Sequence, residues 1–245
     1  MSKIESKKAL ITGGASGIGK LMGLQLLQKG LATLVIWDVN ETLLQSTALE
    51  FKKMGYDVYI YLVDVMNTTQ VINTAALVKK EVGKIDILIN NAGIVVGKYF
   101  IDHTHEDIDK TININCNALM HITKEFLGDM MHTKQGHIVN IASAAGMVSN
   151  PKLSVYVASK FAVIGWSDSL RLEMEKEKTN VKITTVTPFF ISTGMFEGVN
   201  SNIVPIVKPQ DAVNKIIRGI ENDRLYVRMP GIVNWVYFVK GILPA

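Results

Sequence analysis

Short apolar runs alternate along this chain with longer segments of helical periodicity, and this alternation restricts the fold more than any other feature. The runs indicate buried strands at 9–12, 34–38, 57–62, 86–90, 137–141, 182–187 and 225–227. The segments between them predict helices over 20–28, 40–53, 68–82, 106–131, 154–177 and 211–220. A helix that joins two strands in this way forms a right-handed crossover between parallel strands. We therefore predict an α/β fold in which helices cover both faces of a parallel sheet.

Length and composition fit a single globular unit. The chain has 245 residues, of which 48% are hydrophobic and 20% are charged, so it can bury a large core. We predict one domain over 1–245, because open α/β sheets of this size commonly form one unit. The single Cys116 excludes an internal disulfide and favours a reducing, cytoplasmic location. No apolar leader precedes Lys7 and no apolar run approaches a membrane span, so neither a signal peptide nor a spanning helix is expected.

Charge and histidine content argue against two classes of partner. The net charge of +4 is small and the lysines are scattered, which favours a solvated surface over a nucleic-acid interface. The five histidines show no metal-ligand spacing with Cys116 or with paired carboxylates. We therefore expect neither nucleic acid nor a metal ion as a ligand.

A glycine-rich segment follows the first predicted strand and opens the first predicted helix. Its sequence is Gly13-Gly14-Ala15-Ser16-Gly17-Ile18-Gly19. Glycines here let backbone N–H groups and the helix N-terminus approach a pyrophosphate, and the last glycine allows the helix to pack closely on the sheet. Loops are often rich in glycine, but the order of strand, glycine loop and helix predicts a dinucleotide site.

A carboxylate ends the second predicted strand, about twenty residues after the glycines, as in dinucleotide-binding folds. Asp38 is placed to accept hydrogen bonds from a ribose 2′-hydroxyl and to repel a 2′-phosphate, which favours NAD over NADP. A helix-capping role for Asp38 is compatible with this function. Asp64 and Val65 follow the third predicted strand, where the edge of an adenine could be recognised.

A tyrosine and a lysine lie one turn apart on one face of the helix predicted over 154–177. They are Tyr156 and Lys160. An unperturbed tyrosine ionises near pH ~10, and a neighbouring cation favours the phenolate, so the pair can act as a base. Ser143 follows the strand 137–141 and can hold an alcohol or carbonyl oxygen while a proton moves. Because this spacing also occurs by chance in many helices, its weight depends on the rest of the chain.

Four motifs in this order resemble those of the short-chain dehydrogenase/reductase family. They are Thr12-Gly-x-x-x-Gly17-x-Gly19, Asn90-Asn91-Ala92-Gly93, Ser143, and Tyr156-x-x-x-Lys160. Each motif is weak alone, but together they cover essentially the whole chain. The resemblance implies a single doubly wound (Rossmann) sheet of seven parallel strands that holds NAD(P) across its carboxyl ends. The segments 35–40, 142–146 and 159–162 are most similar to the retinol and 17-beta-hydroxysteroid dehydrogenase branch.

The resemblance also implies a role for each catalytic residue. Tyr156 is expected to be the general acid/base, Ser143 to orient the substrate oxygen, and Lys160 to bind the nicotinamide ribose and lower the pKa of Tyr156. One asparagine of the segment 113–117 is expected to hold a water in a proton relay to Lys160. Asn115 fits best, and we expect the other two asparagines to be surface or interhelical polar groups.

The segment after the sixth predicted strand completes the expected cofactor site. By resemblance, Pro188, Ile191 and Thr193 stand where the family holds the nicotinamide, with the threonine on its carboxamide. Phe189 departs from the glycine that is usual in the family, so we expect it to narrow the pocket. The predicted cofactor-binding residues are Gly13, Ala15, Ser16, Gly17, Ile18, Gly19, Asp38, Asp64, Val65, Asn91, Ala92, Gly93, Tyr156, Lys160, Pro188, Ile191 and Thr193.

Three loops, at 94–96, 144–151 and 189–204, are expected to form the substrate pocket. None carries a cluster of Arg or Lys for a carboxylate or phosphate, so we predict an apolar alcohol or ketone that is lipid-, retinoid- or steroid-like. Two glycines in the third loop can hinge a lid over about 189–207. The predicted substrate-binding residues are Ser143, Ala145, Val148, Tyr156, Phe189 and Phe196.

Several functions remain open from the sequence. The leading one is an oxidoreductase that transfers a hydride between NAD(H) and an apolar alcohol or ketone, and the alternative within this class is a reductase of small polar carbonyls or sugars. A dinucleotide-binding regulator would be expected to lack the serine, tyrosine or lysine, and all three are present. A structural protein of lipid surfaces is supported only by the aromatic segment 231–245.

Two parts of the chain are expected to make contacts outside the site. The apolar C-terminal segment 231–245 could touch a membrane interface or cover the pocket, although a docked helix or a subunit contact is the simpler explanation. The helices predicted over 106–131 and 154–177 have apolar residues beyond one face. This distribution favours a homodimer or homotetramer built around a two-fold axis.

Overall fold

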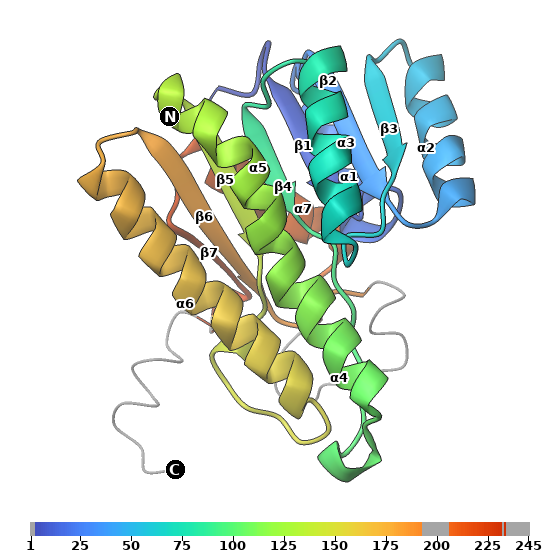
Figure 1. The fold of residues 1–245 in the computed structure, drawn as a ribbon, viewed down its shortest axis with the longest axis vertical. Coiled ribbons are helices and arrows are strands. Elements are labelled where there is room, and N and C mark those ends of the chain that lie inside the picture. The colour runs from blue at the N-terminus through green and yellow to red at the C-terminus, as the bar shows by residue number, and fades with distance from the viewer. Residues whose placement is uncertain (1–2, 193–205, 232, 234–245) are drawn as a thin grey trace.

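The structure, a computed structural model, describes residues 3–192, 206–231 and 233. Within them, parallel strands form one seven-stranded sheet in the order β3-β2-β1-β4-β5-β6-β7 (Figure 1). The strands are β1 (Lys8–Thr12), β2 (Thr33–Asp38), β3 (Val58–Leu62), β4 (Ile87–Asn90), β5 (Gly136–Ile141), β6 (Val181–Pro188) and β7 (Tyr226–Met229). The strand order reverses between β1 and β4, and this reversal opens a crevice at their carboxyl ends. The predicted doubly wound parallel sheet is confirmed.

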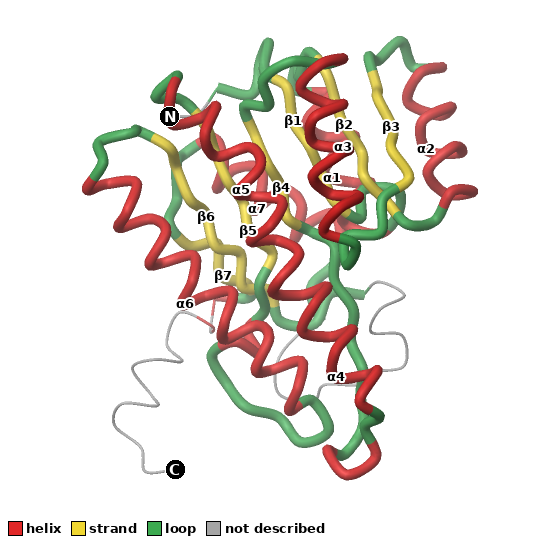
Figure 2. Tube along the Cα trace, in the orientation of Figure 1, coloured by secondary structure: helices red, strands yellow, loops and turns green. Residues whose placement is uncertain are grey.

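Helices cover both faces of the sheet (Figure 1; Figure 2). The α-helices are α1 (Gly17–Gln28), α2 (Glu41–Lys53), α3 (Thr68–Glu81), α4 (His105–Ile112), α5 (Ala118–His132), α6 (Ser154–Lys176) and α7 (Pro209–Glu221), and the short helical segments are η1 (Phe100–Asp102), η2 (Asn113–Asn117) and η3 (Ala144–Gly146). Side chains alternate along β1, so that Ile11 packs with α1, α2 and α7 while Leu10 packs with α3, α5 and α6. Because both faces are buried, the central strands are continuous apolar runs.

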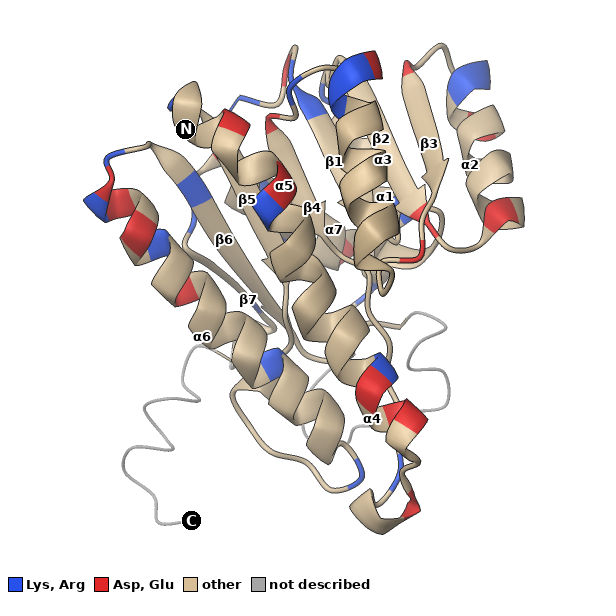
Figure 3. Ribbon diagram, viewed as in Figure 1, with Lys and Arg blue, Asp and Glu red and all other residues tan. Residues whose placement is uncertain are grey.

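Local signals determine where several helices begin. Asn40 and Asn67 cap α2 and α3, each accepting a hydrogen bond from a backbone N–H of the first turn. Thr104 and Asp107 form a capping box at the start of α4. Charged residues of both signs occur near several helix ends (Figure 3). These caps fix the loops that precede the helices, and those loops lie at the carboxyl edge of the sheet.

The long helix predicted over 106–131 is interrupted in the structure. Helix α4 ends at Ile112, η2 is a π-helical turn over Asn113–Asn117, and α5 begins at Ala118. A π turn holds an extra residue, which rotates the positions after it, and such turns are frequent at functional sites. Apolar periodicity averages over an insertion of this kind, so the sequence pattern predicted one unbroken helix.

The predicted lid and C-terminal segment fall largely outside the described residues. Of the lid, the structure describes 189–192 with 206 and 207, where Ile191 and Val207 form a parallel β-bridge. Phe190 and Val207 are joined by a backbone hydrogen bond of 2.9 Å. Thr193 and Phe196, and nearly all of 231–245, lie outside the described residues, so the predictions for them stay predictions.

Candidate active site

The glycine loop between β1 and α1 presents bare backbone to an open space. Gly17 has φ +53°, and a Cβ added there would meet no atom within 4 Å. A Cβ on Gly19 would lie 2.2 Å from the Gly13 carbonyl oxygen, so only glycine lets α1 approach the loop this closely. Ser16 precedes α1 without capping it by its side chain, and the first turn holds no acidic residue. The N-terminus of α1 therefore keeps its free N–H groups and its positive field, which suit an anion.

A hydrogen-bond clamp ties this loop to the end of β4. The Thr12 hydroxyl accepts from the backbone N–H groups of Asn91 (3.0 Å) and Ala92 (3.1 Å). The Asn91 side chain donates to the carbonyls of Thr12 and Gly13, both at 3.0 Å. The polar turn that follows β4 thus lines the site and also positions the glycine loop. Thr12 supports this arrangement through its hydroxyl, a role that motif spacing alone did not indicate.

Both carboxylate oxygens of Asp38 are held by backbone groups. Oδ2 accepts from the Ala15 N–H at 3.0 Å, and Oδ1 accepts from the Asn40 N–H at 3.0 Å. Ala15 itself is buried, and its carbonyl accepts from the Thr47 hydroxyl. Ala15, a predicted cofactor-binding residue, is not among the described residues that line the cavity, and it instead orients Asp38.

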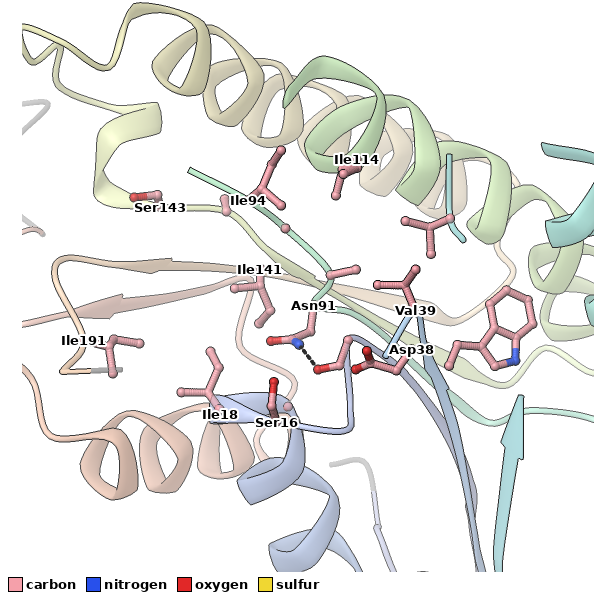
Figure 4. A pocket seen from close by; sticks show the side chains of 18 of the residues that line it. Ser16, Ile18, Asp38, Val39, Asn91, Ile94, Ile114, Ile141, Ser143 and Ile191 are labelled. Atoms are coloured by element: carbon pink, nitrogen blue, oxygen red, sulfur yellow. Dashed lines mark hydrogen bonds between the residues drawn. The ribbon is translucent and has the colours of Figure 1, made fainter. Parts of the chain in front are cut away.

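A cavity of about 590 Å³ runs along the carboxyl ends of the strands. Figure 4 shows Ser16 and Ile18 on one side of it and Ile94 and Ile114 on the other, with Asp38 and Asn91 between them in this view. The predicted residues that line it are Gly13, Ser16, Gly17, Ile18, Gly19, Asp38, Asp64, Val65, Asn91, Ala92, Gly93, Ser143, Tyr156, Lys160, Pro188, Phe189 and Ile191. The sequence did not indicate Trp37, Val39, Val63, Ile114, Ile141 and Ala142 as lining residues. Most of these residues are sequence neighbours of a predicted site residue at the end of a strand. That adjacency is the sequence signal from which they could have been predicted.

The predicted catalytic side chains meet at one end of this cavity. Tyr156 and Lys160 lie on α6, and Ser143 follows β5 and caps η3 by accepting from the Ala145 N–H at 3.1 Å. All three predicted residues are buried, with Tyr156 and Lys160 each 5% exposed. The Lys160 ammonium lies 5.7 Å from the centre of the Tyr156 ring and donates to the Ile141 carbonyl at 2.9 Å. The fold thus brings together the residues that the motif spacing predicted.

Burial shifts the pKa values of these groups in the direction that favours the neutral side chain. It raises the pKa of Tyr156, while a hydrogen bond with the Ser143 side chain acts in the opposite direction. It lowers the pKa of Lys160 to about 8, with the nearby Cys116 acting in the opposite direction. In this structure the pKa of Tyr156 is therefore raised, contrary to the lowering expected from Lys160, because burial outweighs the other influences.

Asn115 sits in the π turn and points into the protein. Its Oδ1 accepts from the Ile94 N–H at 2.8 Å, and its Nδ2 donates to the Ile94 carbonyl at 2.9 Å and to the Ser159 hydroxyl at 3.2 Å. A Cβ added at Gly93 would lie 3.2 Å from Asn115 Oδ1 and 3.7 Å from Lys160 Nζ. Gly93 therefore lies close to both groups, and its missing side chain avoids a tight contact with Asn115 Oδ1.

The other two asparagines of the π turn are hydrogen-bonded to each other. Asn117 is exposed, and its side chain donates to Asn113 Oδ1 at 2.8 Å. The expectation that both are surface or interhelical polar groups is consistent with these contacts.

A second, smaller pocket of about 160 Å³ adjoins the cavity of about 590 Å³. It is lined by Ser143, Ala144, Ala145, Val148, Ser149, Asn150, Leu153, Tyr156, Phe189 and Phe190. Five of the six predicted substrate-binding residues lie here, and the sixth, Phe196, lies outside the described residues. Leu153 was not predicted, because it lies beyond Pro151, where the expected loop ended.

Within the described parts of the chain, no helix combines the length and apolarity needed to cross a bilayer. The same residues contain no group of three or more His, Cys, Asp or Glu side chains arranged to hold a metal ion.

These features define a dinucleotide-dependent oxidoreductase fold, and comparison with known proteins identifies the family. Residues 7–203 match the family model described as short chain dehydrogenase, and the chain belongs to that family. A solved structure of a short chain dehydrogenase/reductase from Burkholderia phymatum, in complex with NAD, has a TM-score of 0.88 to this chain at 26% sequence identity. The alignment covers 97% of this chain and 94% of that one.

Similar curated proteins fall in the predicted branch. The chain is 42% identical over 240 residues to epidermal retinol dehydrogenase 2 of Mus musculus, a match that covers 96% of this chain and 77% of that protein. It is 36% identical over 236 residues to estradiol 17-beta-dehydrogenase 11 of Homo sapiens, covering 96% of this chain and 78% of that protein. The predicted similarity to retinol and 17-beta-hydroxysteroid dehydrogenases is confirmed.

Proposed function

We propose that this protein transfers a hydride between NAD(H) and the carbinol or carbonyl carbon of an apolar alcohol, aldehyde or ketone. The observation that carries the proposal is that the side chains of Ser143 and Tyr156 line both the cofactor cavity and the smaller pocket. A substrate oxygen held by their hydroxyls has its carbon at the boundary between the two spaces. Membership of the family supports the same chemistry, since the relatives named above are dehydrogenases.

The residues around the larger cavity fit a dinucleotide. The uncapped N–H groups at the start of α1 and the bare surface of Gly17 suit a pyrophosphate. Asp38 has one backbone N–H on each oxygen, which leaves lone pairs for ribose hydroxyls. A 2′-phosphate would face this carboxylate, so we propose NAD rather than NADP as the cofactor.

Three buried side chains have different roles in the proton transfer. Tyr156 exchanges a proton with the substrate oxygen, and Ser143 donates a hydrogen bond to that oxygen. Lys160, whose ammonium lies 5.7 Å from the centre of the Tyr156 ring, supplies positive charge nearby. A nicotinamide, when bound, supplies the hydride acceptor for an alcohol or the hydride donor for a carbonyl. Because these residues lie away from bulk water, their electrostatic interactions are stronger than on a surface.

The composition of the smaller pocket supports an apolar substrate. Its described lining contains no Lys, Arg, Asp or Glu, and Val148, Leu153, Phe189 and Phe190 give it apolar walls. The names of the relatives refer to retinol and estradiol, which are both largely apolar alcohols. We therefore propose the same class of substrate for this chain.

The test follows nicotinamide absorbance while the purified protein is offered NAD or NADP with apolar alcohols and, separately, with sugars. We expect turnover of apolar alcohols with NAD. A preference for NADP would contradict the role given to Asp38, and better turnover of sugars would contradict the apolar pocket. Tight binding of NAD without turnover of any alcohol or carbonyl would favour a dinucleotide-binding regulator.

A further inference from the structure

Three described side chains line both the cofactor cavity and the substrate pocket: Ser143, Tyr156 and Phe189. They therefore surround the place where the two spaces meet. Two of them carry the hydroxyls that, in the proposed function, hold the substrate oxygen. The third is a benzyl group without a polar atom, so it acts on a substrate only by occupying space and offering apolar contact.

The position of Phe189 is fixed by the sheet. Pro188 pairs with Met229 at the end of the β6–β7 ladder, and the Phe189 N–H donates to the Met229 carbonyl at 2.8 Å. The Phe189 ring meets the Phe190 ring edge to face, with centroids 4.7 Å apart and an interplanar angle of 69°. It also packs against a buried cluster that includes Ala144 and Met147. These contacts hold the Phe189 ring in place.

The geometry of a carbinol carbon decides which of its groups meets this wall. Such a carbon has four substituents. In the proposed function its oxygen is held by Ser143 and Tyr156, and the hydrogen to be transferred faces the larger cavity. A substrate chain that occupied the smaller pocket toward Val148 and Leu153 would leave the fourth substituent beside Phe189, the third residue that lines both spaces. In a primary alcohol this substituent is hydrogen, and in a secondary alcohol it is carbon.

We propose that Phe189, supported by Phe190, restricts this enzyme to primary alcohols and the corresponding aldehydes with a slender chain at the reacting end. This inference rests on the proposed function and chooses between two kinds of apolar alcohol that the proposed function leaves open. The volume of the smaller pocket, about 160 Å³, agrees with it. A cavity of about 150 Å³ accommodates one benzene ring, so a pocket of this volume offers little room for a second bulky group on the carbinol carbon.

The test compares three isomeric alcohols whose fourth substituent grows from hydrogen to methyl to propyl: 1-octanol, 2-octanol and 4-octanol. In the wild type we expect kcat/KM with NAD to fall by about tenfold or more at each step, since one methylene in a fitted pocket changes kcat/KM by about 10- to 200-fold. In Phe189→Ala we expect the ratio of 4-octanol to 1-octanol to rise by about tenfold or more. Leu172→Ala, which truncates an exposed side chain of α6 that lines neither space, is the control and should leave that ratio near the wild-type value.

Two further measurements keep the result interpretable. NADH affinity, measured by fluorescence, reports whether Phe189→Ala disturbs the cofactor cavity, and the melting temperature reports whether it disturbs the fold. If the Phe189→Ala variant does not fold, Phe189→Leu is used in its place. Equal kcat/KM for all three isomers in the wild type would overturn the inference. An unchanged ratio in a folded, NADH-binding Phe189 variant would do the same. Absence of turnover of every isomer by the wild type contradicts the proposed function itself, and the inference with it.

Discussion

The ionisable residues of this site are held out of water, and their chemistry follows from that. Burial raises the pKa of Tyr156 and lowers the pKa of Lys160, so it favours the neutral phenol and the neutral amine. Each charged form therefore depends on a nearby group that stabilises its charge. The hydroxyl of Ser143 and the carbonyl of Ile141 supply part of that compensation. Such an arrangement costs stability, and it leaves both groups responsive to a charged ligand in the cavity.

We predict that Lys160 makes stability depend on pH in a defined direction. Its pKa is lowered from 10.5 in the unfolded chain to about 8 in the folded protein, so between these values the unfolded state binds more protons and stability rises with pH. From pH 8 to pH 9 the wild type should gain about 1 kcal/mol relative to Lys160→Met. Urea denaturation of both proteins at pH 7, 8 and 9 measures this difference, and parallel pH profiles would contradict it.

We predict that Asp38 sets the choice of cofactor. Asp38→Asn keeps an oxygen that can accept from the Ala15 N–H but removes the negative charge that faces a 2′-phosphate. The ratio of kcat/KM with NADP to that with NAD should rise by about tenfold or more, because a like-charge contact costs several kcal/mol and about 1.4 kcal/mol already corresponds to tenfold. Asp64→Asn, which neutralises another carboxylate lining the same cavity, is the control. Equal changes in the two variants would mean that general charge, and not Asp38, is responsible.

At the scale of elements, the π turn between α4 and α5 is the feature that the sequence pattern missed. Helical periodicity predicted one helix over 106–131, and only the family motif pointed to Asn115 within it. The turn depends on tertiary contacts of Asn115 with Ile94 and Ser159, which are far away in the sequence. Local propensity carries no information about such contacts, whereas the ends of β1, β2 and β4 were predictable because each combines an apolar run with a polar or glycine-rich stop.

We predict that Asn115 stabilises the π turn. Asn115→Ala leaves the part-buried N–H and carbonyl of Ile94 without their side-chain partner and should lower the free energy of unfolding by about 1–3 kcal/mol. Asn117→Ala, the same substitution two residues later on an exposed side chain, should change it by less than about 0.5 kcal/mol. Chemical denaturation of the two variants checks this, and a similar loss in both would contradict the assignment.

We predict that the close packing of α1 against the glycine loop is required for cofactor binding. In Gly19→Ala the new Cβ would overlap the Gly13 carbonyl, so the loop must move, and the Kd for NADH should increase by about tenfold or more. Gly128→Ala, in an exposed part of α5 where a Cβ meets nothing within 4 Å, should bind NADH normally and be slightly more stable. Titration by NADH fluorescence separates the two, and an unchanged Kd in Gly19→Ala would refute the prediction.

For the molecule as a whole, the alternation of strands and helices was enough to predict the sheet and the edge at which the site lies. Motif residues from four strand ends meet at that edge because parallel strands bring their carboxyl ends together. The sequence could not predict how burial shifts the pKa of Tyr156, since that shift depends on packing by segments distant along the chain. The cytoplasmic location and the two-fold assembly stay predictions.

The central claim is that Tyr156 is the acid/base of an NAD-dependent dehydrogenase. The most direct measurement compares the wild type with Tyr156→Phe for NAD-dependent oxidation of a primary apolar alcohol, with NADH affinity measured in parallel. We predict that kcat falls by about 10²- to 10⁴-fold while the NADH Kd changes little, because the variant loses a proton-transfer group and keeps the shape of the cavity. A Tyr156→Phe variant that retains wild-type turnover would contradict the account.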